Sequence, residues 1–271
     1  MNFCFIGHVT QDRFDSSQGC GGSSLYGALL MAHLGERASI ITSCSEDFPS
    51  HAYQNVQWHI QPSAKTTTFG ISYASNQRIL SKRSTANVLE SSWISKHVPD
   101  SHAVMVCPVI DEVDPQVIDD LGSKWIGLTP QGWFRSFDEN GKMTQTKSKH
   151  SFSLKKISLI VVSQEDIQND PSAWTNAKKS ARVAVCTMGK KGYILSCEGF
   201  EKAFSPLQVM EEKNPTGCGD IFATGLLFLL SKGFESKDAA MFAGYAAGLA
   251  ATKNDILNSI KLAGNFLQSK L

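Results

Sequence analysis

The stretch Asn214-Pro215-Thr216-Gly217-Cys218-Gly219-Asp220 decides the fold, because it joins a turn, three small residues and the start of a helix. Asn and Pro favour a turn, and proline also sets the backbone angle for entering a helix. The three small residues let backbone N–H groups approach a ligand closely. Residues 221–230 are predominantly apolar and predict a helix with an apolar stripe.

The start of this helix favours a bound anion. Its first turn has N–H donors without an intrahelical acceptor, and the helix dipole places partial positive charge there. Asp220 is the one feature of this helix start that disfavours an anion, because a carboxylate repels a phosphate. Its presence is explained if it takes a proton from a hydroxyl that attacks phosphorus. A purely structural explanation is also open, since an acidic first-turn residue stabilises a helix by up to ~1 kcal/mol.

The same seven residues resemble the C-terminal motif D-T-x-G-A-G-D of the ribokinase-like (PfkB) carbohydrate kinases. The resemblance implies that Asp220 is the catalytic base and that residues 217–219 supply the N–H groups of an anion hole. Asn214, Pro215 and Cys218 stand where the family usually has Asp, Thr and Ala. Cysteine is small and packs like a hydrophobic residue. The other two changes leave open whether a monovalent cation binds.

Two further landmarks lie near the N-terminus. Asp12 follows an apolar strand expected at residues 2–6, where the family often has an Asp that binds sugar hydroxyls. A carboxylate suits that role because it accepts from two hydroxyls, although a solvated turn residue is the simpler alternative. Gly21 and Gly22 precede a helix expected at residues 25–35 and resemble the first PfkB motif, in which two glycines let substrate lie against the backbone.

A third landmark follows the strand expected at residues 182–187. Thr187, Gly189 and Gly192 match the family's T-x-G-x-x-G, which implies that they line the nucleotide. A tight hairpin between two strands explains the same glycines. The small residues 246–248 leave room for an adenine, or for close packing of helices.

The candidate metal ligands follow the strand expected at residues 158–162. Ligands of parallel α/β sheets bind at the carboxyl ends of strands, and the family usually has an N-x-x-E motif here that organises Mg²⁺. This chain has Ser163 and Asp166 at those positions. Asp166, or alternatively Glu165, would hold Mg²⁺ through water. A serine N-cap followed by acidic first-turn residues explains the same letters.

The landmarks occur in the family's order and extend over nearly the whole chain. Alternating strands and helices favour a three-layer α/β/α fold with a mostly parallel central sheet. We predict one ribokinase-like kinase domain over residues 1–271, with a small β lid formed by segments around 10–20 and 52–85. The second segment is polar, and residues 66–74 alternate with the period of a strand.

Composition excludes several classes of protein. The chain of 271 residues is 42% hydrophobic and 19% charged, with a net charge of +1, so neither nucleic acid nor a membrane is an expected partner. The seven cysteines form no C-x-x-C pair, which argues against a zinc site or a disulfide framework. The N-terminus lacks the pattern of a signal peptide and residues 239–252 are too short to span a bilayer, so a cytoplasmic protein is expected.

Together these features predict an ATP- and Mg²⁺-dependent kinase that phosphorylates a hydroxyl of a small sugar or inositol-like polyol. A nucleoside kinase is the alternative, with Phe69, Tyr73 or Trp133 stacking on the base. A catalytically weak sensor of sugar or nucleotide also stays open. An NAD-dependent oxidoreductase is disfavoured because the dinucleotide fingerprint is incomplete. Relatives often dimerise through the lid, and the small lid leaves a homodimer open here.

Overall fold

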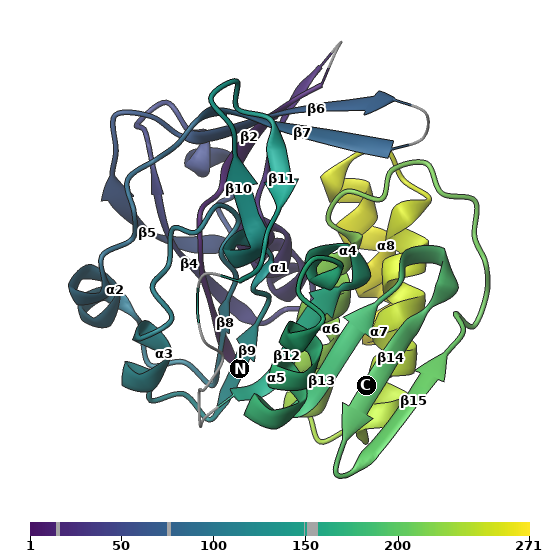
Figure 1. Ribbon diagram of the computed structural model, residues 1–271. Helices are drawn as coiled ribbons and strands as arrows, with labels where there is room; N and C mark the ends of the chain where they lie inside the picture. Colours follow the sequence, from purple (N-terminus) through teal and green to yellow (C-terminus); the bar gives the residue numbers. More distant parts are fainter. Residues whose placement is uncertain (15–16, 75–76, 149, 151–156) are drawn as a thin grey trace.

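The computed structural model describes residues 1–14, 17–74, 77–148, 150 and 157–271. In this part of the chain, a nine-stranded sheet forms the centre of the molecule (Figure 1). All neighbouring pairs from β5 to β13 are parallel, and β14 and β15 extend the sheet as antiparallel strands. In spatial order the strands are β15 (Phe200–Phe204), β14 (Tyr193–Cys197), β13 (Ala181–Thr187), β12 (Ile157–Ser163), β9 (Trp125–Leu128), β8 (Ala103–Val106), β1 (Asn2–Ile6), β4 (Arg37–Cys44) and β5 (Val56–Pro62).

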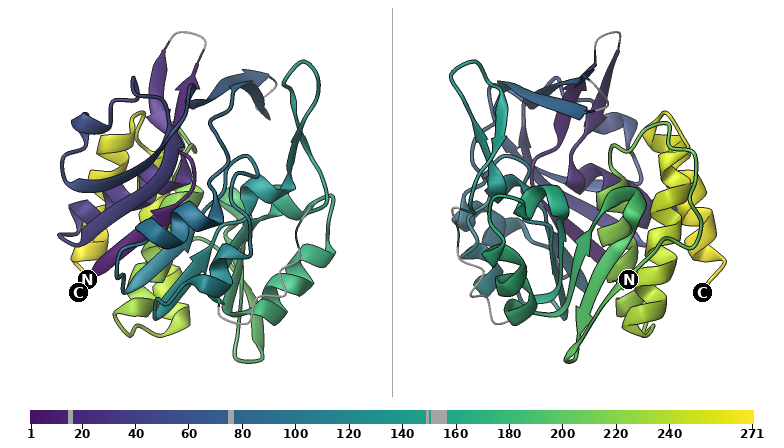
Figure 2. Two further views of the ribbon diagram at one scale, coloured as in Figure 1. Left: turned by 90° about the vertical axis from the view of Figure 1, so that its left-hand side faces the viewer. Right: turned by 45° about the vertical axis from the view of Figure 1, so that its right-hand side comes forward.

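Helices cover both faces of this sheet, so the predicted three-layer fold is confirmed (Figures 1 and 2). Phe3 and Phe5 of β1 pack into one apolar cluster and Cys4 and Ile6 into the other. This alternation explains why β1 reads as a continuous apolar run: both of its faces are buried. The first cluster includes α1 (Ser23–His33), α6 (Cys218–Ser231), α7 (Ser236–Ala251) and α8 (Ile256–Gln268); the second lies under α2 (Ser91–His97), α3 (Val117–Asp120), α4 (Gln164–Ile167) and α5 (Ser172–Ser180).

A separate four-stranded sheet lies above one edge of the molecule, where the sequence predicts a lid, and we call this sheet the lid (Figure 2). Its order is β3 (Gln18–Gly21), β2 (Thr10–Arg13), β6 (Thr67–Ala74) and β7 (Gln77–Ser84). The predicted lid segments need one correction, because β5 is the edge strand of the central sheet and not part of this sheet. A parallel pairing with β4 places β5 there.

A hairpin of β10 (Arg135–Phe137) and β11 (Met143–Gln145) lies beside the lid, and an isolated bridge joins Ser81 to Lys142. Asn140-Gly141, a dipeptide typical of hairpin turns, lies between these two strands, and Gly141 has a φ of 78°.

The direction of α6 fixes which edge of the sheet carries the Asn214–Asp220 motif. Lys232, directly after α6, places Nζ 2.6 Å from Oε1 of Glu36, which directly precedes β4. The end of α6 therefore lies at the amino edge of the parallel strands, and its start lies at the carboxyl edge, where the lid is. Ligands bind at this edge in open α/β sheets.

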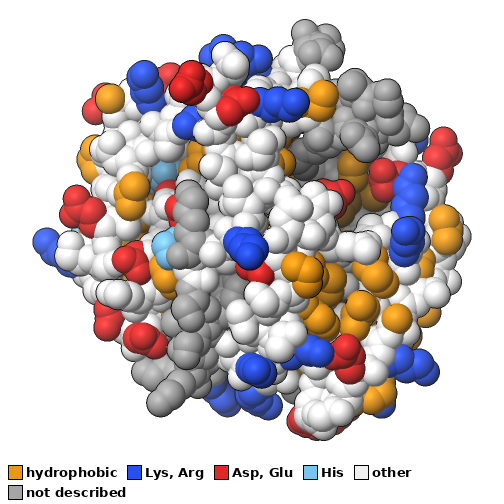
Figure 3. All heavy atoms as spheres, viewed as in Figure 1, with side chains coloured by type: hydrophobic (Ala, Val, Ile, Leu, Met, Phe, Trp, Pro, Cys, Tyr) orange, Lys and Arg blue, Asp and Glu red, His pale blue; other side chains and the backbone are white. Residues whose placement is uncertain are grey.

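On the face shown in Figure 3, basic and acidic side chains are interspersed, as the small net charge leads one to expect. Within the described residues, none of the helices combines the length and apolar character needed to cross a membrane.

Candidate active site

The helix α6 begins three residues earlier than predicted, inside the motif itself. Its N-cap is Gly217, which has a left-handed backbone with a φ of 81°. A methyl group at this position would overlap the ring of Tyr26 on α1. Glycine is thus required here both by the backbone angle and by the neighbouring ring.

The turn before α6 is held by its own residues. Asn214 accepts from the N–H of Thr216 through Oδ1 at 2.9 Å, and Cys218 donates its N–H to the carbonyl of Pro215 at 3.2 Å. The next N–H, on Gly219, belongs to the first turn, whose donors have no acceptor within the helix. Apart from its two chain neighbours and the backbone of its own helix, no heavy atom of the described residues lies within 4 Å of where a Cβ on Gly219 would be. The space beside Gly219 is therefore open to a ligand.

Asp220 is half-buried in the first turn of α6 and lies near the end of β8. Burial, and then the nearby carboxylates of Asp220 and Glu112, raise the pKa of the Cys107 thiol well above its usual value. Burial, followed by the carboxylates of Glu212 and Asp220, also raises the pKa of Cys218 to about 12. Cys218 is therefore a neutral thiol at physiological pH and adds no negative charge where a phosphate would bind.

The residues predicted to hold an acceptor meet in the lid. Asp12 on β2 is 7% exposed, and its Oδ1 accepts from the hydroxyl of Thr10 at 2.9 Å. Gly21 on β3 pairs with Thr10, and a side chain at position 21 would overlap Oδ2 of Asp12. Gly22 is the N-cap of α1, with a φ of 96°, and packs against the carbonyl of His8. The glycine pair therefore gives Asp12 and the backbone room to lie together.

Tyr26 connects this acceptor side to the motif. It lies one turn into α1 from Gly22, and its ring packs on Gly217. The two glycine-containing segments are thus neighbours at the carboxyl edge, although Gly217 lies 195 residues after Gly22 in the sequence. A single tyrosine in an apolar helix carries no sequence signal for this role.

The predicted nucleotide residues form a tight connection between β13 and β14. Thr187 ends β13 and donates its hydroxyl to the carbonyl of Val162 at 3.4 Å. Gly189 and Gly192 have positive φ values of 56° and 97°, and a side chain at 192 would overlap the carbonyl of Phe204. A tight turn between two strands explains why residue 192 is a glycine. The surroundings of Gly189 within the described residues are open.

The segment that leads into the motif lies over α7. Lys190 pairs with Glu212 at 3.8 Å, and the N–H groups of residues 213–214 donate to the carbonyl of Ala251. Met210 covers Gly248, with its sulfur 3.6 Å from the position of a Cβ. The space that residues 246–248 leave for an adenine is therefore partly occupied by a thioether.

The candidate metal ligands form a helix cap. Ser163 accepts from the N–H of Asp166 at 3.0 Å, and Asp166 Oδ2 accepts from the N–H of Ser163 at 3.0 Å. This capping box begins α4. Glu165 is exposed in the same turn. No cluster of three or more metal-ligating side chains occurs among the described residues, so Mg²⁺ would be held here through one or two carboxylates, water and donor phosphates.

Ser163→Ala is expected to lower the free energy of unfolding by about 1 kcal/mol, because it removes an N-cap acceptor. Denaturation in urea measures this change. Gln164→Ala is the control, since residue 164 is exposed in the same turn and does not cap α4. Equal unfolding energies for the two variants would contradict a stabilising role for the capping box.

Two of the three aromatic residues considered for base stacking are buried, one under the four-stranded sheet and one in the core beside the central sheet. Phe69 is 4% exposed and stacks on Phe137 with ring centroids 6.0 Å apart. Trp133 is fully buried, and its indole N–H donates to the carbonyl of Val113 at 2.9 Å. The side chain of Tyr73 lies outside the described residues. This arrangement gives little support to recognition of a base by Phe69 or Trp133.

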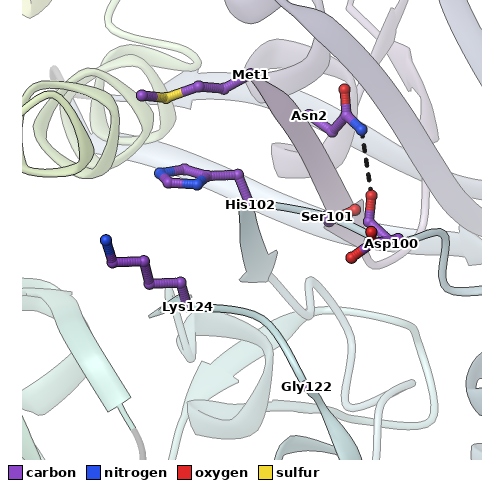
Figure 4. Close-up of a pocket in the computed structure, with 7 residues that line it drawn as sticks. All are labelled: Met1, Asn2, Asp100, Ser101, His102, Gly122 and Lys124. Atoms are coloured by element: carbon purple, nitrogen blue, oxygen red, sulfur yellow. Dashed lines mark hydrogen bonds between the residues drawn. The ribbon is translucent and has the colours of Figure 1, made fainter.

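A separate cavity of about 490 Å³ lies at the opposite edge of the sheet (Figure 4). Asn2, His102 and Lys124 line it, at or just before the amino ends of β1, β8 and β9. None of the predicted site residues contributes to this cavity. Its position at the amino edge separates it from the motif.

Comparison with known proteins supports the fold. Residues 152–261 match the model of the pfkB family carbohydrate kinases. No curated protein sequence matches the chain. The fold is similar to that of a pyrophosphate-dependent myo-inositol-1 kinase converted into a myo-inositol-3 kinase by mutation, with a TM-score of 0.80, 20% identity and coverage of 99% of each chain.

Two further solved structures share the fold. One is a nucleoside kinase from Burkholderia thailandensis in complex with inosine, with a TM-score of 0.74, 15% identity and coverage of 97% and 96% of the two chains. The other is the ribokinase of Thermotoga maritima, with a TM-score of 0.70, 14% identity and coverage of 98% of each chain. The ribokinase-like fold is therefore established over the whole chain.

Proposed function

We propose, from the match of residues 152–261 to the model of the pfkB family carbohydrate kinases and from the ribokinase-like fold of the chain, that this protein is a phosphotransferase that acts on a small polyhydroxy acceptor. The acceptor class is a sugar or an inositol-like polyol. The observation that carries the proposal is the position of Asp220, half-buried in the first turn of α6 beside the open backbone of Gly219. A base and an anion-binding helix start then lie next to each other.

In the proposed reaction, Asp12 and the backbone at Gly21 and Gly22 hold hydroxyls of the acceptor. Asp220 takes the proton of one hydroxyl as its oxygen forms a bond to the terminal phosphorus of the donor. The bond between that phosphorus and the bridging oxygen breaks, and the shortened donor leaves with the electron pair. The N–H groups at the start of α6 stabilise the charge on the transferred phosphoryl group.

Mg²⁺ bound near Asp166 or Glu165 would neutralise charge on the donor phosphates. Asp166 fits this role in part. Its Oδ2 accepts the capping hydrogen bond from the N–H of Ser163, and this bond does not use its other carboxylate oxygen. Thr187, Gly189 and Gly192 are the proposed contacts of the donor. ATP is the donor that the T-x-G-x-x-G resemblance favours.

Pyrophosphate is a second candidate donor, and a specific contact favours it. Met210 covers Gly248 at the place where an adenine was expected, while a pyrophosphate would need only the anion-binding start of α6. The similar fold of a pyrophosphate-dependent kinase supports the same alternative. A nucleoside remains the second candidate acceptor, supported by the shared fold of an inosine-bound kinase.

The test is turnover with Mg²⁺ and either ATP or pyrophosphate, across a panel of sugars, inositols and nucleosides, with Asp220→Asn beside the native protein. We expect phosphorylation of one acceptor class with one donor, lost in the variant. Binding of donor and acceptor without turnover by the native protein would contradict the kinase proposal and favour a sensor. Ligand-induced stabilisation measures that binding independently.

A further inference from the structure

His8 lies where the core meets the lid. It follows β1 and Gly7 at the carboxyl edge, and it is fully buried. Its Nε2 lies 2.9 Å from the carbonyl oxygen of Asn87, and its Nδ1 lies 2.8 Å from the hydroxyl of Thr67. A carbonyl oxygen only accepts, so Nε2 donates to Asn87, and Nδ1 shares the second hydrogen bond with the hydroxyl of Thr67.

Both partners belong to the connections between core and lid. Thr67 is the first residue of β6, and Asn87 follows the end of β7. The hydroxyl oxygen of Thr67 also accepts from the N–H of Ala86 at 3.0 Å. The chain therefore enters and leaves this part of the lid at one imidazole ring.

The backbone of His8 is fixed to the core on its other side. Its N–H donates at 2.8 Å to Oε1 of Glu112, a carboxylate that is 1% exposed. Glu112 also accepts from the N–H groups of Val109 and Ile110, at distances of 2.7–3.0 Å. The carbonyl of His8 packs on Gly22 of the proposed acceptor site. One residue thus contacts the core, both lid connections and Gly22 of the proposed acceptor site.

We propose that His8 is a positioning residue whose ring holds the two lid connections in register with Asp12 and Gly22, and thereby sets the affinity for the acceptor. The inference rests on the proposed function, because that proposal places the acceptor between lid and core. Without the ring, β6 and β7 lose their common attachment and the lid closes less well over the acceptor. Gly219, at the proposed donor site, lies on a different element, so donor binding should change little.

His8→Ala is expected to raise the KM for the acceptor about tenfold, the equivalent of one lost hydrogen bond of about 1.4 kcal/mol, while the donor KM stays within about twofold. Amide hydrogen exchange in β6 and β7 should become faster, while exchange in β1 and β4 stays unchanged. His8→Asn places an amide near Nδ1 and His8→Gln near Nε2. Each variant should therefore recover part of the effect.

Thr67 tests the same contact from the lid side. Thr67→Val removes the hydroxyl, whereas Thr67→Ser retains it and should keep the native KM. The changes His8→Ala and Thr67→Val should be clearly non-additive, because they remove a shared interaction. Additive effects would contradict a direct coupling between the two side chains.

Leu267→Ala is the control for general destabilisation. Leu267 is fully buried near the end of α8, remote from the lid. We expect a lower Tm without a change in acceptor KM or lid exchange. If His8→Ala behaves in the same way, the positioning role is wrong and His8 is only a packed core residue. If the native protein shows no turnover with any acceptor, the proposed function fails, and lid exchange alone still decides the role of His8.

Discussion

Replacing Asp220 by asparagine is expected to lower kcat about a thousandfold, since general-base groups contribute roughly 10²–10⁴ to rate. Asparagine has nearly the same shape but cannot take a proton from the acceptor. Donor affinity should stay the same or rise, because the variant removes a negative charge beside the donor phosphates. Steady-state rates and calorimetric titration with the donor measure the two effects.

Asp238→Asn provides a matched control. Asp238 is the third residue of α7, as Asp220 is the third residue of α6, but it is exposed on a helix outside the proposed site. Both variants lose the same favourable interaction between a carboxylate and a helix start. Only Asp220→Asn should lose turnover. A near-normal kcat for Asp220→Asn would contradict its assignment as the base.

Gly217→Ala is expected to lower stability, whereas Gly219→Ala is expected to weaken donor binding. Residue 217 has a left-handed backbone, which is unfavourable for alanine, and a methyl group there would overlap the ring of Tyr26. We expect a loss of about 2–4 kcal/mol in the free energy of unfolding, from backbone strain and overpacking together. Denaturation in urea measures this loss.

At position 219 the surroundings within the described residues are open. Alanine also favours a helix over glycine by up to about 1 kcal/mol. Gly219→Ala should therefore fold at least as stably as the native protein. Its methyl group would lie where the donor phosphates approach, so the donor KM should rise about tenfold, equivalent to about 1.4 kcal/mol. Equal stability and equal donor KM for both variants would contradict the separate roles of the two glycines.

Much of the fold could be predicted from local patterns. The apolar run of β1 and the alternation within β6 are both short-range signals, and the structure confirms them. The position of β5 could not be predicted in this way. Its polar, partly exposed sequence looks like a lid strand, but parallel pairing with β4 places it at the edge of the central sheet.

The candidate site likewise contains residues that local sequence patterns indicate and residues that only the folded structure brings together. The glycines and Asp220 form motifs that the sequence displays directly, and their roles as ligand contacts remain predictions. Tyr26, His8 and Glu112 act through contacts between distant parts of the chain. His8 contacts Thr67 across 59 residues and Glu112 across 104. Such residues have no local pattern, because their roles exist only after the chain has folded.

The central position of β1 has a consequence for biosynthesis. Its apolar Phe3 pairs with Ala38 on one side and with Ala103 on the other. At translation rates of roughly 5–20 residues per second, Ala103 is made about 5–20 seconds after Phe3. One edge of β1 stays unpaired during that interval, exposing a strand that is otherwise enclosed. Newly made chains should therefore depend on protection against aggregation until β8 has left the ribosome.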